Sequence, residues 1–179
     1  MNKLSIVKSF LLSLAALLSA AILVPASWAH DNCTPYTAVF HLEGTSPFGP
    51  LNGGGIYNIG DQPPQQAQVA AVLKDSATLD PTSPVSEITF SDMVLFAPGA
   101  DGSLNVLTAV DKSIGTATGP GTFTATTKSR ITGGVGLYKD VTGSANSTNI
   151  THVNLATGHT VSDVKVQGKI CGIGQAGNK

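Results

Sequence analysis

The chain has 179 residues, and 150 of them remain once a leader-like segment of 29 residues at the start is set aside, which is the size of one domain. These 150 residues include 20 Gly, 19 Thr and 11 Ser but only 8 Lys or Arg and 11 Asp or Glu, a composition that argues against helical bundles and coiled coils. The resulting net charge of −3, without any basic cluster, argues against a nucleic-acid partner.

The first 29 residues have the order of a secretory signal peptide. Lys3 and Lys8 provide a positive start, and residues 9–24 form an apolar stretch. Ser27 and Ala29 then place small residues at positions −3 and −1 of a cleavage site. The apolar stretch is shorter than the roughly 20 residues of a membrane-spanning helix. We predict cleavage after Ala29, a secreted or periplasmic protein, and no membrane attachment of the mature chain.

The two cysteines are predicted to form a disulfide, because exported proteins reach an oxidising compartment. Cys33 lies near the start of the mature chain and Cys171 near its end, so the bridge would join the first and last structural elements. No CxxC motif and no Cys/His ligand spacing points to metal or catalytic chemistry instead. We therefore expect neither a metal nor a cofactor.

The first third of the mature chain contains one clear strand and a segment that the sequence leaves open. Residues 37–43 alternate between apolar and polar side chains, which predicts a strand. The following segment is rich in Gly, Pro and Gln, and we interpret its run Gly53-Gly54-Gly55 as a turn. Residues 65–74 fit a helical face and a buried strand equally well.

From residue 85 onward the alternation is clearer. Residues 85–96, 104–108 and 122–131 each read as strands, and a Gly-rich turn at residues 133–136 ends the third of them. Residues 142–154 alternate Ser, Asn and Thr, and we interpret residues 146–151 as a solvated face. The last strand places Val164, Val166, Gly168 and Ile170 on one side. Seven or eight strands with turns about every ten residues predict a single antiparallel barrel or sandwich.

The segment from residue 85 to residue 172 resembles a known family of small exported barrels. Its central run, Ile131-Thr-Gly-Gly-Val-Gly-Leu-Tyr138, is similar to the GGTG motif and following aromatic residue of the allene oxide cyclase-like and dirigent-like group, with Val135 in place of Thr. Gly143 matches the later glycine of that motif. The resemblance implies an all-β fold, a single antiparallel eight-stranded barrel of calycin-like shape. The early Phe40-His41-Leu42-Glu43 stretch is only loosely similar to that of plant dirigent proteins, so no active-site residue is carried over.

The interior of such a barrel is the natural place for a small ligand. Five polar residues are the main candidates for ligand contacts: His41, Glu43, Asp92, Arg130 and Tyr138. His41 and Glu43 would form an acid–base pair if both faced inward, but their spacing of two fits an outward polar face equally well. Asp92 interrupts an apolar face, and we expect a bulge that turns it outward, with an inward position as the alternative.

Arg130 and three polar residues outside this group of five have further alternative roles. Arg130 is the only arginine of the chain, and it suits either a ligand carboxylate or a surface position beside Lys128. Tyr57 is a further interior candidate. His152 and His159 flank a turn, but without a third ligand they make a poor metal site.

Three functions are consistent with these features. The leading one is an exported barrel that binds a small apolar molecule; the alternatives are a dirigent-like cyclase or isomerase and a cell-surface or matrix structural protein. No Ser-His-Asp elbow, phosphate-binding loop or metalloprotease motif assigns an enzyme class. Asn32, Asn146 and Asn149 begin Asn-x-Thr sequons, which would be glycosylation candidates only in a eukaryotic secretory pathway. The ligand and the oligomeric state are left open.

Overall fold

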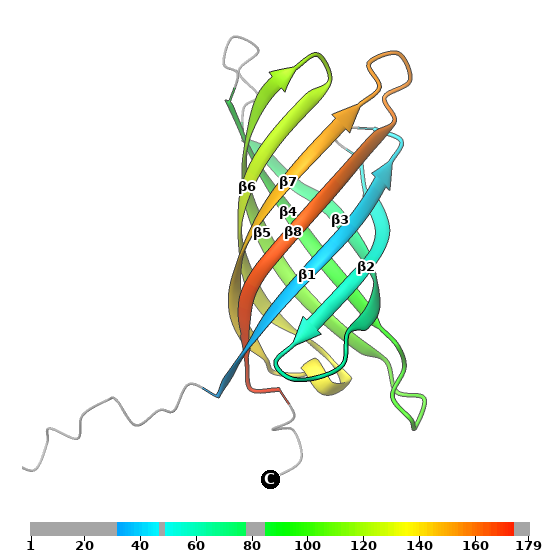
Figure 1. Cartoon of the computed structure of the whole chain (residues 1–179), viewed down its shortest axis with the longest axis vertical. Coiled ribbons are helices and arrows are strands. Elements are labelled where there is room, and N and C mark those ends of the chain that lie inside the picture. Colours follow the sequence, from blue (N-terminus) through cyan, green and yellow to red (C-terminus); the bar gives the residue numbers. More distant parts are fainter. Residues whose placement is uncertain (1–31, 47–48, 78–84, 174–179) are drawn as a thin grey trace, which may run out of the picture. The chain divides into compact units, whose positions relative to one another are not determined.

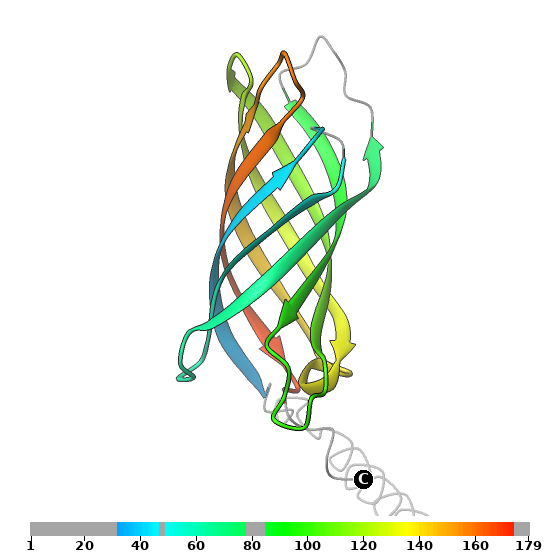
Figure 2. The same cartoon turned by 90° about the vertical axis from the view of Figure 1, so that its right-hand side faces the viewer.

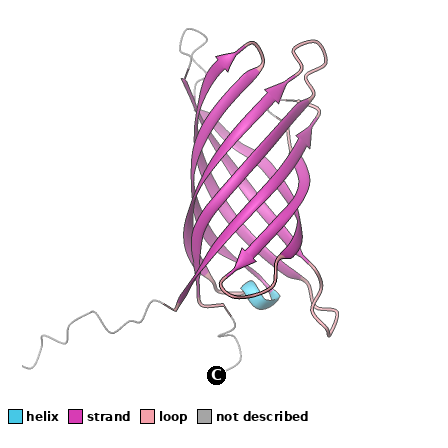
Figure 3. Cartoon of the chain, viewed as in Figure 1, coloured by secondary structure: helices cyan, strands magenta, loops and turns pink. Residues whose placement is uncertain are grey.

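The protein folds as one closed barrel of eight antiparallel strands, as predicted (Figure 1 and Figure 3). The computed structural model describes residues 32–46, 49–77 and 85–173, so the predicted signal peptide and the first mature residues lie outside the described residues. Each strand pairs with its neighbours in chain order: β1 Cys33–Gly44, β2 Leu51–Ile59, β3 Gln65–Ala77, β4 Val85–Phe96, β5 Asn105–Gly119, β6 Thr122–Val135, β7 Thr142–Val153 and β8 Thr160–Cys171. One 3₁₀ turn, η2 (Gly136–Tyr138), follows β6.

The barrel closes where the first strand meets the last. β1 and β8 pair along their whole length, from Cys33 opposite Cys171 to Gly44 opposite Thr160. A disulfide joins the two cysteines across this seam and closes a loop with a sequence separation of 138, so the predicted pairing is confirmed. Such a bond is typical of proteins that fold in an oxidising, extracellular-type environment. Within the described residues, no helix has the length and apolar character needed to cross a bilayer.

The strands are strongly tilted about the barrel axis, as closure of a small barrel requires (Figure 1 and Figure 2). The glycine run interpreted as a turn lies inside β2, so that expectation was wrong. Gly53 and Gly55 share the inward parity of Leu51, and a Cβ on either would collide with a backbone carbonyl of β1. These glycines let β1 approach closely enough to pair, which side chains at those positions would prevent.

The structure also decides two further segments. The sequence left one of them open and predicted a different end for the other. Residues 65–74 belong to β3, whose alternate residues Ala67, Val69 and Ala71 are buried. β6 continues to Val135 instead of ending at the glycine-rich run. The run contains a bulge, because the β5–β6 register shifts after Thr108 and Gly133 has φ of 127°. The bulge shifts the register without ending the strand.

One end of the barrel is filled by aromatic side chains. Tyr36, Phe40, Tyr57, Phe96 and Tyr138 form a chain of ring contacts with centroid separations between 4.7 and 5.5 Å. We call these five residues the aromatic plug. All are buried, and the plug lies at the end that carries η2 and the disulfide. This end of the interior is therefore packed like a core.

Candidate functional site

The other part of the interior contains a cavity of about 360 Å³. Its floor is formed by three residues of the plug, Tyr36, Phe40 and Tyr57. Above them the inward positions of β5, β6 and β7 carry small side chains: Ala109, Ser113, Gly115, Ala125, Ser129 and Ser147. Small side chains facing one another across a barrel of fixed radius leave space, whereas aromatic side chains fill it. The volume lies in the range of about 300–1,000 Å³ that is usual for small-molecule sites.

The cavity opens toward the end of the barrel opposite the plug. Phe123, at the start of β6, lines the cavity and is 38% exposed, whereas the plug residues are 3–6% exposed. The β5–β6 and β7–β8 connections lie at this end (Figure 1). The interior therefore has a closed floor and a more accessible mouth.

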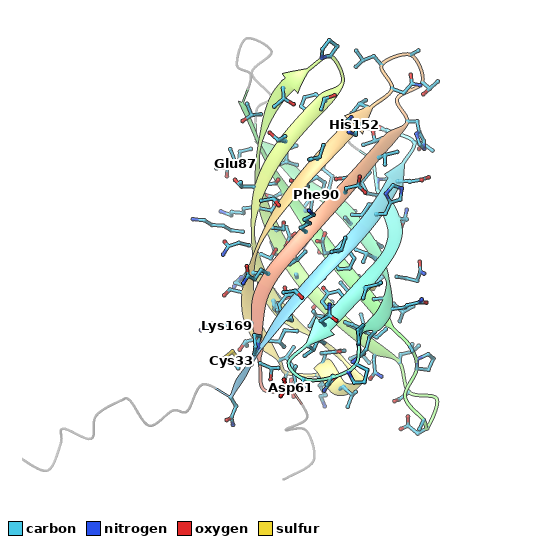
Figure 4. The ribbon with its side chains drawn as sticks, in the orientation of Figure 1. Cys33, Asp61, Glu87, Phe90, His152 and Lys169 are labelled. Atoms are coloured by element: carbon cyan, nitrogen blue, oxygen red, sulfur yellow. A yellow bond between two sulfur atoms is a disulfide. The ribbon has the colours of Figure 1, made fainter. Side chains whose placement is uncertain are left out.

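Two carboxyl groups stand side by side on the cavity wall. Asp92 of β4 lies opposite Ala109, and Asp111 of β5 lies opposite Phe90, so the two carboxyls are diagonal neighbours on the inner face. Figure 4 labels Phe90 midway along the barrel. The expected outward bulge at Asp92 was wrong: the β4–β5 register is unbroken there, so Asp92 keeps the inward parity of its apolar neighbours.

Burial controls the protonation of this acid pair. Desolvation, the charge of Asp111 and the hydrogen bond with Asp111 together raise the pKa of Asp92 to about 9, and desolvation is the largest of these causes. Desolvation also raises the pKa of Asp111, although hydrogen bonds with Asp92 and Ser129 partly offset that shift. The pair therefore retains a proton near neutral pH, and Asp92 is the member that holds it.

Two tyrosines of the plug line the same cavity as the acid pair and are close enough to be affected by its charge. Burial raises the pKa of Tyr36 and of Tyr57 above the usual value, and the nearby Asp92 and Asp111 charges raise both further. Both phenols are therefore neutral at physiological pH. Both tyrosines therefore contribute uncharged groups to the surroundings of the acid pair.

A polar strip continues from the acid pair along the inner wall. The Thr127 hydroxyl donates a hydrogen bond to Ser113 Oγ at 2.9 Å, and the Thr151 and Ser162 hydroxyls are hydrogen-bonded at 2.9 Å. Asn149 also lines the cavity. The interpretation of residues 146–151 as a solvated face was thus only half correct: Asn146 and Thr148 are exposed, but alternate residues of β7 face inward.

His41 and Glu43 lie on the outer face of β1, where they form an exposed cluster with β8. His41 Nδ1 lies 2.8 Å from Asp163 Oδ1 and Nε2 lies 3.3 Å from Glu43 Oε1. His159 Nε2 is 3.7 Å from Glu43 Oε2. Hydrogen bonds to Asp163 and Glu43 raise the pKa of His41. The outward alternative for this pair is the one the structure shows, so neither residue reaches the cavity.

The other candidates are also distributed outside the cavity, with one exception. Arg130 is exposed on the outer face of β6. Tyr138 is buried in the plug beneath the cavity floor, and burial raises its pKa to about 12. Tyr57 does line the cavity. His152 contacts Thr122 on the outer surface, and no group of three or more His, Cys, Asp or Glu side chains among the described residues is arranged so that it could hold a metal ion.

Sequence reasoning missed Asp111, the partner of Asp92. The signal was present: Leu107, Ala109, Asp111 and Ser113 alternate, and Leu107 is a core residue. The expected strand, however, ended at residue 108, whereas β5 extends to Gly119. Once the strand is extended, its parity places a second carboxylate inside the barrel.

Comparisons with known proteins do not assign a family. No family model, no curated protein and no solved structure matches this chain. The resemblance to allene oxide cyclase-like and dirigent-like barrels therefore stays a prediction.

Proposed function

We propose that this protein is an exported barrel that binds a small, mainly apolar molecule in its interior. The observation that carries the proposal is the cavity itself: about 360 Å³, with a closed aromatic floor and a wall of apolar side chains along which a polar strip runs. A concave cavity lined mainly by apolar surface, with polar groups at fixed positions, is the usual form of a small-molecule site. The disulfide supports an oxidising location, which agrees with the export signal predicted for residues 1–29.

The proposal is tested by filling the cavity from one strand. Ala125 and Thr124 are adjacent in β6, but Ala125 lines the cavity and Thr124 is exposed. The Ala125→Phe variant should lose binding of a panel of naphthalene derivatives in isothermal titration calorimetry, whereas Thr124→Phe should bind like the wild type. Circular dichroism checks that both variants fold. The proposal fails if the wild type binds no member of the panel, or if Ala125→Phe binds them unchanged.

One observation favours a second candidate, a cyclase or isomerase. The Asp92 carboxyl stays protonated near neutral pH and lines the cavity, so it is available as a general acid toward a bound molecule. Mass spectrometry of ligands recovered after incubation separates the two functions. A binding protein returns each ligand unchanged, whereas an enzyme returns an isomer with the wild type and unchanged ligand with Asp92→Asn.

A further inference from the structure

The groups that could bring charge into the cavity near neutral pH are both acidic. Asp92 and Asp111 supply two carboxyl groups, and none of the described residues that line the cavity is Lys, Arg or His. A carboxylate buried without a positive partner is unfavourable, which is why the pair retains a proton. A ligand that carried a positive charge into the cavity would supply the partner that the barrel wall lacks.

Three oxygen atoms of the cavity wall also lack a hydrogen-bond partner. Oδ1 of Asp92, Oδ1 of Asp111 and Oδ1 of Asn149 are fully buried and have no hydrogen-bond partner among the described residues. Buried polar atoms are almost always paired in native proteins, so such exceptions call for an explanation. All three atoms are acceptors when the carboxyls are ionised, so the group that completes them is a donor.

The surroundings of the acid pair suit a compact cation attached to an apolar body. Phe90 lies directly opposite Asp111 in the β4–β5 register, and Tyr36 is close enough to be affected by both carboxyl charges. Aromatic faces attract ammonium groups, most strongly where water is excluded. Val69, Leu107 and Val164 provide apolar wall elsewhere in the cavity.

We propose that the cavity binds an apolar molecule bearing one primary amine, with its ammonium group against Asp92 and Asp111 and its hydrocarbon part in the remainder of the cavity. This inference rests on the proposed binding function and names its ligand class. An amine that enters as the free base takes a proton from a carboxyl: an N–H bond forms as the O–H bond breaks, which leaves an ammonium–carboxylate pair. An alcohol of the same shape donates one hydrogen bond but brings no charge.

Three naphthalene probes of nearly equal size test the proposal: 2-(1-naphthyl)ethylamine, 2-(1-naphthyl)ethanol and the carboxylate anion of 1-naphthaleneacetic acid. Titration calorimetry of the wild type at pH 7 should give an affinity for the amine at least about tenfold higher than for the alcohol, with the carboxylate weakest. In the Asp92→Asn/Asp111→Asn variant the amine should bind at least about tenfold more weakly than in the wild type. The alcohol should bind that variant about as well as the wild type.

A matched control removes two carboxylates from the outside of the barrel. Glu43 and Asp163 are exposed on β1 and β8, so Glu43→Gln/Asp163→Asn removes two carboxylates without touching the cavity. Because the acid pair retains a proton at pH 7, this control changes the net charge at least as much as the cavity variant does. This variant should keep the preference for the amine. Equal loss in both double variants would mean that net charge, and not the acid pair, attracts the amine, which would overturn the proposal.

A second measurement needs no substitution, so it stands even if the cavity variant does not fold. Carboxyl ¹³C NMR of the wild type follows the titration of the acid pair, and amine binding should shift that titration to lower pH by at least about one unit. Amine binding without such a shift would overturn the inference. Equal affinity for amine and alcohol would also overturn it but would leave the binding function standing, whereas failure of every probe to bind would remove the binding function itself.

Discussion

Replacing Asp92 by asparagine should change how the stability of the protein depends on pH. Burial raises the pKa of the Asp92 carboxyl from 3.8 to about 9 in the folded protein. Between these two values the folded protein holds a proton that the unfolded chain has released. The free energy of unfolding therefore falls as the pH rises through this window. Asparagine is neutral at every pH and its amide can still donate to Asp111, so the variant lacks this dependence.

The size of the effect follows from the width of the window. One pH unit inside it corresponds to about 1.4 kcal/mol of unfolding free energy. The step from pH 5 to pH 8 lies entirely inside the window, so the loss attributable to Asp92 has an upper bound of roughly 4 kcal/mol. Relaxation of the barrel and entry of water into the cavity reduce this bound. Asp111 remains in the variant, and because a hydrogen bond with Asp92 contributes to its pKa, its own contribution changes when Asp92 is replaced.

Urea unfolding followed by circular dichroism, on both proteins at pH 5 and pH 8, measures the effect. The decisive quantity is the change in unfolding free energy between the two pH values in the wild type minus the same change in Asp92→Asn. His41, whose raised pKa also favours the folded state at low pH, contributes equally to both proteins and cancels. A difference below about 1 kcal/mol, close to the error of extrapolation, would refute the assignment of a protonated, buried Asp92.

Three further predictions concern the barrel itself. Replacing both disulfide cysteines by serine should lower the unfolding free energy by up to about 5 kcal/mol, given the loop of 138 residues, and unchanged urea unfolding would contradict this. Gly55→Val should lower the unfolding free energy by about 3 kcal/mol or more, because its side chain would meet the backbone of β1. Gly54→Val, on the outer face, should lower it far less, and equal thermal midpoints of the two variants would contradict the close approach of β1 to Gly55. The pKa of His41, measured by NMR, should lie above its usual value in the wild type and fall in Asp163→Asn, because Asp163 makes its principal hydrogen bond; an unmoved titration would exclude that contact in solution.

Local sequence patterns were sufficient for much of the framework. Residues 37–43 and 85–96 alternate so regularly that each defines a strand with two faces, and both strands are present. The cysteines near the two ends of the mature chain indicated that the first and last strands meet, which the seam between β1 and β8 confirms. Compartment and chain position predicted that bond without any knowledge of the fold.

The glycine-rich stretch of β2 shows where local patterns failed. A run of three glycines has the composition of a turn, and only the backbone of β1 lying against it explains why a strand requires them. That contact joins Gly53 to His41 and Gly55 to Val39, which lie 12 and 16 residues earlier on the neighbouring strand. Local propensity contains no information about it, so the segment could not be assigned from the sequence.

The site depends even more strongly on tertiary structure. Alternation determined that His41 and Glu43 share one face, and that Asp92 shares the face of Val94 if the strand is regular. Which of these faces became the interior was decided by closure of the barrel, which turned the His41 face outward and brought Asp92 beside Asp111. The physical reason is that side-chain parity along a strand is local, whereas the register between strands and the space left among their inward side chains arise only when all eight strands pair.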